Sequence, residues 1–459
     1  MNSRLSHYMA IMSIMLTFLL VASRVIAMDV LDQKIGQMIM VSYAPDTAFE
    51  DTLHYDLEHR NLGGVILYRF HLHDPVQIRE LTSELQDKAG TLPFIATDQE
   101  GGFVARLDET NGFAETHTAY HLGTVIDKED STRRQAKMMA HWLHDCGINT
   151  NLAPVVDVNV NPSSPAIGYL ERSFSAQPYK VFDHARWFIS EFEKLDIITA
   201  LKHFPGHGSA EQDSHLGFTD ITSTWADSEL VPYRELISNG YSGMVMPGHL
   251  YNADLDPVYP ASLSESIITD LLRDNLGFEA VVISDAMFMR AITNNYSFEE
   301  AIVLAVNAGT DVLLYTSNEY GGRSLVAVVI RIIREHVDAG VIAQARIEAS
   351  YQRIMALKAR FTVISPLAQR IVPDNFSFHI YPNPFNISTH IQVDMSKAGP
   401  LSFSVYDISG RQLHRQQLSW LSEGTHAIPF DASALASGVY ITKCEAAGTI
   451  RFEKMTLIK

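Results

Sequence analysis

Residues 202–215, Lys-His-Phe-Pro-Gly-His-Gly-Ser-Ala-Glu-Gln-Asp-Ser-His, carry six ionisable side chains within a short stretch of chain. Pro205, Gly206 and Gly208 interrupt this segment, so it cannot form a regular helix. The preceding residues 195–201 are largely apolar and predict a buried strand. We therefore expect the charged groups to emerge at the carboxyl end of that strand, on a loop.

Asp213 and His215 are separated by a single residue within this segment. If the loop is extended there, the two side chains point to the same side. A carboxylate beside an imidazole fixes the imidazole tautomer and raises its pKa, which suits a proton donor that later acts as a base. The pair could also be an ordinary surface Asp-x-His without a chemical role.

Asp285 directly follows the apolar run Ala280-Val-Val-Ile-Ser284. An ionised carboxylate at such a strand end, near a lysine, could attack the anomeric carbon of a sugar. Taken alone, Asp285 could equally be the cap of a following helix.

A zinc site is the main competing interpretation, because His203, His207, Asp213 and His215 are plausible ligands. Lys202 argues against it, since an ammonium group next to His203 would repel a cation, and no His-x-His closes the first strand. We expect no metal and no organic cofactor.

Eight apolar runs alternate with longer segments of helical pattern, which predicts a parallel sheet covered on both faces. Eight such units over this length favour a (β/α)8 barrel, and the missing Gly-x-Gly-x-x-Gly fingerprint weakens a doubly wound alternative. The runs are residues 38–42, 64–68, 93–97, 151–156, 197–201, 243–246, 280–284 and 310–315.

Polar side chains follow five of these runs, and in this fold the carboxyl ends of the strands form the mouth that holds the active site. A cap after one strand would be unremarkable, but five together predict a site. The side chains are those of Asp98 and Glu100, Asp157, Lys202 and His203, His249, and Asp285.

The chain divides by pattern into four parts. Residues 1–27 have the charged, apolar and small-residue regions of a secretory signal peptide, with an uncleaved anchor as the alternative. Residues 28–362 form the barrel and residues 363–375 a linker. Short alternating strands between turns in residues 376–459 predict a small all-β sandwich.

Composition supports a well-packed globular protein. The chain is 46% hydrophobic and 19% charged, and its net charge of −18 argues against a nucleic-acid partner. Cys146 and Cys444 are too few for a disulfide framework and fall in different predicted domains. We expect both thiols to be free, buried and structural.

The motifs together resemble the β-N-acetylglucosaminidases of glycoside hydrolase family 3, over residues from about 30 to 360. The resemblance implies that Asp285 is the nucleophile and that His215, paired with Asp213, is the general acid and base. The motifs are residues 96–102, 167–174, 202–208, 213–215 and 283–286. The residues implied to hold the sugar are Asp98, Arg106, Arg172, Lys202 and His203.

One position departs from this resemblance. Phe103 follows the paired glycines, where this branch of the family often has a basic residue. We interpret the change as altered polarity at the entrance, on the leaving-group side of the site.

The tail resembles the C-terminal sorting domain of type IX secretion, in residues 381–385, 405–410, 435–441 and 454–459. With the signal peptide, this implies export through the periplasm to the cell surface or medium, with the secretion machinery as a partner. A carbohydrate-binding β-sandwich is the alternative, which the few exposed aromatics predicted there, mainly Trp420, disfavour.

The leading hypothesis is a retaining exo-β-N-acetylglucosaminidase that cleaves oligosaccharides from peptidoglycan fragments or chitin. A phosphorylase of the same family is the first alternative, because a histidine acid/base would not repel phosphate as a carboxylate would. A non-catalytic glycan-binding surface protein is the second alternative.

Overall fold

The computed structural model describes residues 29–44, 50–214, 217–360, 376–395, 398–407, 411–446 and 449–459. The chain forms two compact units, Met1–Val363 and Ile364–Lys459. The predicted signal peptide and linker lie outside the described residues, as does His215.

The first unit contains an eight-stranded parallel sheet in which neighbouring strands follow one another in sequence. A parallel bridge between Ile283 and Val312 joins the two ends of the strand order, so the sheet closes into a barrel. The strands are β1 (Ile39–Ser42), β2 (Gly64–Ile66), β3 (Phe94–Thr97), β4 (Thr150–Asn151), β5 (Ile198–Phe204), β7 (Met244–Pro247), β9 (Val281–Val282) and β10 (Leu313–Tyr315).

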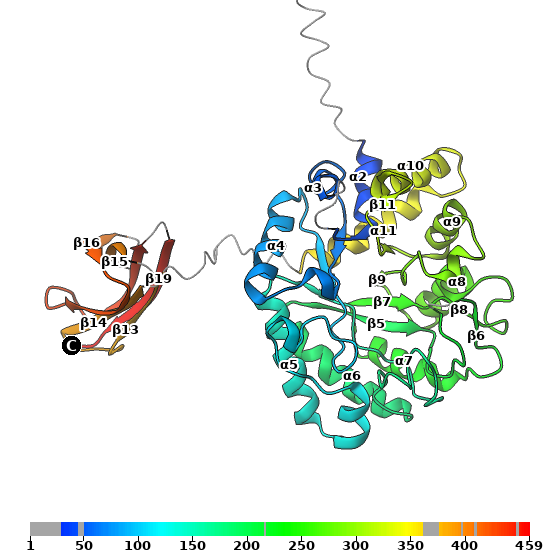
Figure 1. Cartoon of the computed structure of the whole chain (residues 1–459), viewed down its shortest axis with the longest axis horizontal. Coiled ribbons are helices and arrows are strands. Elements are labelled where there is room, and N and C mark those ends of the chain that lie inside the picture. The colour runs from blue at the N-terminus through cyan, green and yellow to red at the C-terminus, as the bar shows by residue number, and fades with distance from the viewer. Residues whose placement is uncertain are drawn as a thin grey trace, which may run out of the picture. The chain divides into compact units, whose positions relative to one another are not determined.

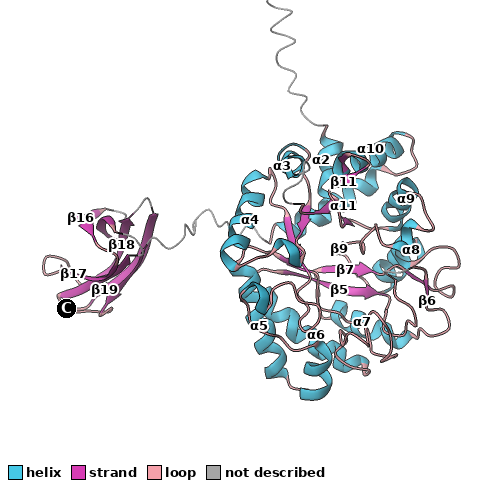
Figure 2. Cartoon of the chain, viewed as in Figure 1, coloured by secondary structure: helices cyan, strands magenta, loops and turns pink. Residues whose placement is uncertain are grey.

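Helices surround these strands, as Figures 1 and 2 show. Their buried faces and the buried strands form one continuous apolar core. The helices are α2 (Val30–Gln37), α3 (Glu50–His59), α4 (Pro75–Lys88), α5 (Glu129–Asp145), α6 (Pro178–Glu193), α7 (Val231–Ser238), α8 (Arg290–Thr293), α9 (Phe298–Ala308), α10 (Leu325–Asp338) and α11 (Gln344–Lys358). Two π-helical segments are η3 (His121–Ile126) and η6 (Ser266–Asn275).

The predicted (β/α)8 barrel is therefore confirmed, although the limits of several strands differ from the prediction, most clearly in β4 and β5. The fourth strand is shorter than predicted, because Pro154 has no N–H for the ladder and only Val155 makes a further bridge, to Lys202. The fifth strand is longer, because its pairing with β7 continues to Phe204. Lys202 and His203 thus belong to β5 and not to the loop after it.

The second unit is the predicted all-β sandwich. Its two antiparallel sheets enclose one core that includes Ile391, Phe403 and Cys444. One sheet has the order β13 (Phe376–Tyr381), β14 (Ser388–Met395), β17 (Gly424–Asp431), and the other β16 (Gln412–Leu421), β15 (Gly399–Asp407), β18 (Gly438–Ala446), β19 (Thr449–Leu457).

Both cysteines, Cys146 and Cys444, are free and buried, as predicted. Within the described residues, no helix combines the length and the apolar character needed to cross a bilayer.

Candidate active site

Lys202 joins two carboxylates at the carboxyl end of the barrel. Its ammonium nitrogen lies 2.9 Å from Asp98 Oδ1 and 2.7 Å from Glu100 Oε1. The other Asp98 oxygen, Oδ2, accepts a hydrogen bond from Arg106 at 3.1 Å. The Lys202 side chain is only 3% exposed, whereas 16% of the Asp98 side chain remains open to solvent. Asp98 can therefore still contact a ligand.

Glu100 is a member of this cluster that the sequence placed at the barrel mouth but to which it assigned no role. Arg172 grips it with two parallel hydrogen bonds, from Nε to Oε2 at 2.9 Å and from Nη2 to Oε1 at 2.8 Å. Asp98 and Glu100 lie two residues apart after a strand, a spacing that can place both side chains on one side. That spacing is the feature of the sequence from which a shared site for Asp98 and Glu100 could have been predicted.

The cluster keeps its members ionised. Burial alone would raise the pKa of Asp98, but the charges of Lys202 and Arg106 outweigh it and hold the pKa below its usual range. The same balance lowers the pKa of Glu100, with Arg172 as the largest favourable charge. Burial disfavours the charged form of Lys202, yet the two carboxylates raise its pKa.

Asp157, after β4, organises the start of the histidine-rich segment. One carboxylate oxygen accepts the backbone N–H groups of His203 and His207, at 2.9 and 2.8 Å. The other lies 2.8 Å from His203 Nδ1. Burial would raise the pKa of this fully buried carboxyl, but the imidazole of His203 and these hydrogen bonds lower it. Asp157 therefore fixes the backbone and one ring of the segment.

The segment packs tightly against the loop after β4. A Cβ at Gly208 would lie 1.7 Å from the carbonyl oxygen of Val158, so only glycine fits there. His207 Nε2 lies 3.1 Å from the hydroxyl of Ser214. Burial and the charge of His203 lower the pKa of His207 to about 4, so this ring is neutral at pH 7.

Ser214 stands between the two residues that sequence reasoning identified as an acid/base pair. Asp213 is half-buried, whereas His215 lies outside the described residues. The contact of Ser214 with His207 anchors the chain immediately before His215.

Asp285 follows β9 at the same end of the barrel and is half-buried. Its Oδ1 accepts the N–H of Ala286 at 2.7 Å. His249 holds the next carbonyl, with Nε2 lying 3.0 Å from the Ala286 oxygen, and Ser262 contacts the other ring nitrogen at 2.7 Å. These contacts fix the backbone that carries the carboxylate.

The pKa of Tyr68 is affected both by Asp285 and by the charged cluster around Lys202. Burial raises the pKa of its hydroxyl, the charge of Asp98 raises it further, the charge of Arg106 opposes this rise, and Asp285 adds to it. The tyrosine therefore lies within electrostatic reach of both carboxylates.

The arrangement suits a neutral ligand rich in hydroxyl groups. Carboxylate oxygens and cationic N–H groups are held rigidly by one another, so they can accept and donate hydrogen bonds without reorganisation. Among the described residues, which do not include His215, no group of three or more His, Cys, Asp or Glu side chains could hold a metal ion.

Two family models match the chain. Residues 30–357 match the glycosyl hydrolase family 3 N terminal domain, and residues 379–459 match the secretion system C-terminal sorting domain.

Curated relatives are similar to the first of these regions. Beta-hexosaminidase A from Pseudoalteromonas piscicida is 34% identical over 275 residues, which are 55% of this chain and 46% of that protein. The beta-hexosaminidase from Tolumonas auensis is 34% identical over 279 residues, 59% of this chain and 80% of that one. The chain thus spans less than half of the first relative and most of the second.

Solved structures resemble the chain to a similar degree. A glycoside hydrolase family 3 beta-N-acetylglucosaminidase from Paenibacillus sp. is 29% identical with a TM-score of 0.66, covering 77% of this chain and 70% of that one. The beta-N-acetylhexosaminidase from Beutenbergia cavernae is 29% identical with a TM-score of 0.64, covering 72% and 99%.

Proposed function

This chain belongs to glycosyl hydrolase family 3, and we propose that it is a retaining exo-β-N-acetylglucosaminidase that removes terminal N-acetylglucosamine from peptidoglycan fragments or chitin oligosaccharides. The observation that carries the proposal is the Asp98–Lys202–Glu100–Arg172 network, which lies at the same end of the barrel as Asp285. The names of the relatives and solved structures support the sugar specificity.

The network would bind the terminal sugar in one orientation. Asp98 and Arg106 keep some exposure, so Asp98 would accept hydrogen bonds from ring hydroxyls and Arg106 would donate hydrogen bonds to them. Lys202, His203 and Arg172 would complete the pocket. Because these groups are already paired, the pocket loses little freedom when the sugar binds.

In the proposed chemistry, an Asp285 oxygen attacks the anomeric carbon and the bond from that carbon to the leaving oxygen breaks. His215 gives its proton to that oxygen, while Asp213 stabilises the imidazolium. Water then attacks the glycosyl ester, His215 takes a proton from it, and Asp285 departs as a carboxylate. Two displacements retain the anomeric configuration.

Replacement of Asp285 tests the nucleophile. Asp285→Ala should reduce turnover of an aryl N-acetylglucosaminide by about 10⁴-fold or more. Added azide should restore activity and give the α-glycosyl azide, because a small anion fits where the carboxylate was. The matched control is Asp274→Asn, on an exposed position of η6. Unchanged activity of folded Asp285→Ala would remove Asp285 from this role.

The acid/base role has its own test. Asp213→Asn and His215→Ala should slow substrates with poor leaving groups far more than aryl substrates that need little protonation. Equal loss on both kinds of substrate would contradict proton donation by this pair.

An assay in phosphate buffer distinguishes a hydrolase from a phosphorylase, because phosphate can then compete with water as the acceptor. We expect free N-acetylglucosamine as the product in phosphate buffer, and accumulation of the sugar 1-phosphate would establish the phosphorylase alternative. Binding of chitobiose without any turnover by the wild type would instead establish a glycan-binding protein.

We also propose export to the cell surface or medium by type IX secretion, supported by the sorting-domain match over residues 379–459. Removal of residues 376–459 should keep the protein out of the medium. The mass of the secreted wild-type protein should fit a start after residue 27 and loss of the tail. Release of the truncated protein at wild-type levels would contradict sorting by the tail.

A further inference from the structure

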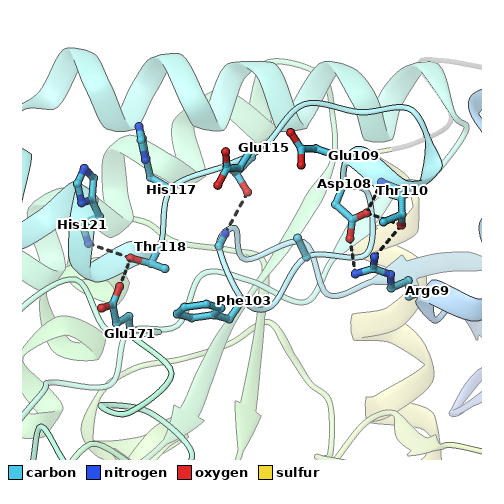
Figure 3. A pocket seen from close by; sticks show the side chains of 13 residues that line it. Arg69, Phe103, Asp108, Glu109, Thr110, Glu115, His117, Thr118, His121 and Glu171 are labelled. Carbon is cyan, nitrogen blue, oxygen red and sulfur yellow. Dashed lines mark hydrogen bonds and ion pairs between the residues drawn. The ribbon is translucent and has the colours of Figure 1, made fainter.

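A cavity of about 420 Å³ lies beside the sugar-binding network (Figure 3). Most of its wall is the loop after β3, from Gly102 to Thr118, and Arg69, His121 and Glu171 complete it. None of Asp98, Lys202 and Asp285 lines this cavity. It is therefore a separate hollow that adjoins the proposed catalytic pocket.

The network and the cavity share two pieces of backbone. The loop that joins Asp98 to Arg106 carries Phe103 at its tip, and Glu171 precedes Arg172. A bridge between Gly101 and Val104 closes the turn. A sugar held by the network would therefore have this cavity as its immediate neighbour.

The tip of the loop is held rigidly. Gly102 has a φ of +60°, and a Cβ there would lie 2.4 Å from Thr118 Cγ2, so the turn is pressed against Thr118. Thr118 is fixed in turn by a 2.7 Å hydrogen bond to Glu171. Phe103 nevertheless remains 70% exposed at the cavity. An exposed aromatic ring beside a pocket, carried on a backbone turn that is held in place, is a surface on which an apolar sugar face can lie.

Carboxylates outnumber cationic side chains in the cavity. Asp108, Glu109, Glu115 and Glu171 line it, and the one lysine or arginine in its lining, Arg69, forms an ion pair with Asp108. The lining also contains His117 and His121, whose ring centroids lie 4.5 Å apart. Figure 3 shows Glu109 and Glu115 along one side of the cavity and Phe103 on another. Such a lining repels an anionic group and accepts a neutral or cationic one.

We propose that this cavity binds the sugar on the leaving-group side and selects N-acetylglucosamine or glucosamine over a muramic acid residue, whose lactyl carboxylate it repels, with Phe103 as the platform for the sugar ring. The inference rests on the proposed glucosaminidase activity and narrows its substrates to chitin-derived oligosaccharides, including partly deacetylated ones.

Three substrates test it: chitobiose, the disaccharide of N-acetylglucosamine linked to muramic acid, and N-acetyl-β-glucosaminyl fluoride, which has no leaving sugar. The wild type should prefer chitobiose to the muramyl disaccharide by about tenfold or more in kcat/KM. Higher ionic strength should narrow that preference, because salt screens the exposed carboxylates.

Two variants assign the effect to the cavity. Phe103→Ala should lower the ratio of kcat/KM on chitobiose to that on the fluoride by about tenfold. The double variant Glu109→Gln/Glu115→Gln should raise kcat/KM for the muramyl disaccharide relative to chitobiose by about threefold or more. Asp274→Asn, which does not line the cavity, is the matched charge control and should change neither ratio.

The outcomes separate the two proposals. No turnover of the fluoride would defeat the proposed function itself. Turnover of the fluoride with equal or better cleavage of the muramyl disaccharide would overturn the inference about the cavity alone, as would a Phe103→Ala variant with wild-type ratios.

Discussion

The ammonium nitrogen of Lys202 lies 2.9 Å from a carboxylate oxygen of Asp98, although 104 residues separate the two in sequence. Adjacent parallel strands bring them together, because β3, β4 and β5 are neighbours in the sheet. Lys202 also neutralises Glu100, so one buried cation serves two carboxylates.

Replacement of that cation should affect activity and stability together. Lys202→Met keeps the length of the side chain but leaves two carboxylates with less compensation. We expect a loss of about 10²-fold or more in kcat/KM and about 3 kcal/mol in the free energy of unfolding. Kinetics and urea denaturation measure the two, with Lys137→Met on the exposed face of α5 as control. A stable, fully active variant would contradict the role of the network.

Asp157 should make the barrel sensitive to acid. Its folded-state pKa lies below the ordinary value of 3.8, so its stabilising effect is present above that pH and is lost as the pH falls through the folded-state pKa. Asp157→Asn should weaken that loss below pH 4 and lower the stability at pH 7 by about 2–4 kcal/mol. Thermal unfolding between pH 2.5 and 7 measures both, with exposed Asp145→Asn as control.

Glu229 should give the stability of the protein the opposite dependence on pH. Burial raises its pKa from 4.5 to about 7, and the charge of Asp157 adds to the rise. Among the described residues, neither Glu229 oxygen makes a hydrogen bond of normal geometry, and this includes any bond from the hydroxyl of Ser209. The folded state holds the proton more tightly, so stability should fall by about 3 kcal/mol as the pH rises from 4.5 to 7.

Glu229→Gln should remove that fall and make the protein more stable than the wild type at pH 8. Urea unfolding across this pH range, with exposed Glu265→Gln as control, measures it. A variant with the wild-type pH dependence would show that Glu229 does not titrate in this range.

Asp311 should be essential for folding and not for chemistry. It precedes β10, at the end of the barrel opposite the site, and it is bound by Arg273, Arg346 and Arg353 at 2.7, 3.1 and 3.2 Å. Asp311→Ala leaves three guanidinium groups without this partner and should cost about 3–5 kcal/mol. The surviving folded fraction should keep its KM, and a changed KM would contradict a purely structural role.

The barrel could be predicted from sequence because each strand is buried on both faces and is therefore a continuous apolar run. The residues at which β4 and β5 end could not be predicted, because they depend on which hydrogen bonds the neighbouring strand offers. Lys202 and His203 belong to β5 through its pairing with β7, which the residues of β5 alone do not reveal.

The side chains of the site could likewise be predicted only in part. Arg106 and Lys202 each form an ion pair with Asp98, so these three predicted site residues lie together, and their sugar-binding role stays a prediction. Glu100 and Asp157 were predicted to lie at the mouth of the barrel but were given no individual role, because a carboxylate after a strand is usually a helix cap and only spatial neighbours reveal another use. The predicted partnership of Asp213 with His215 stays a prediction, since His215 lies outside the described residues.

The first strand of the barrel, β1, pairs with the last, β10, so residue 39 finds its partner only when residue 313 has been made. A chain that ends before β10 lacks this seam and leaves β1 as an open sheet edge. We therefore expect the barrel to close in a single late step, and a truncation before residue 313 to prevent closure altogether.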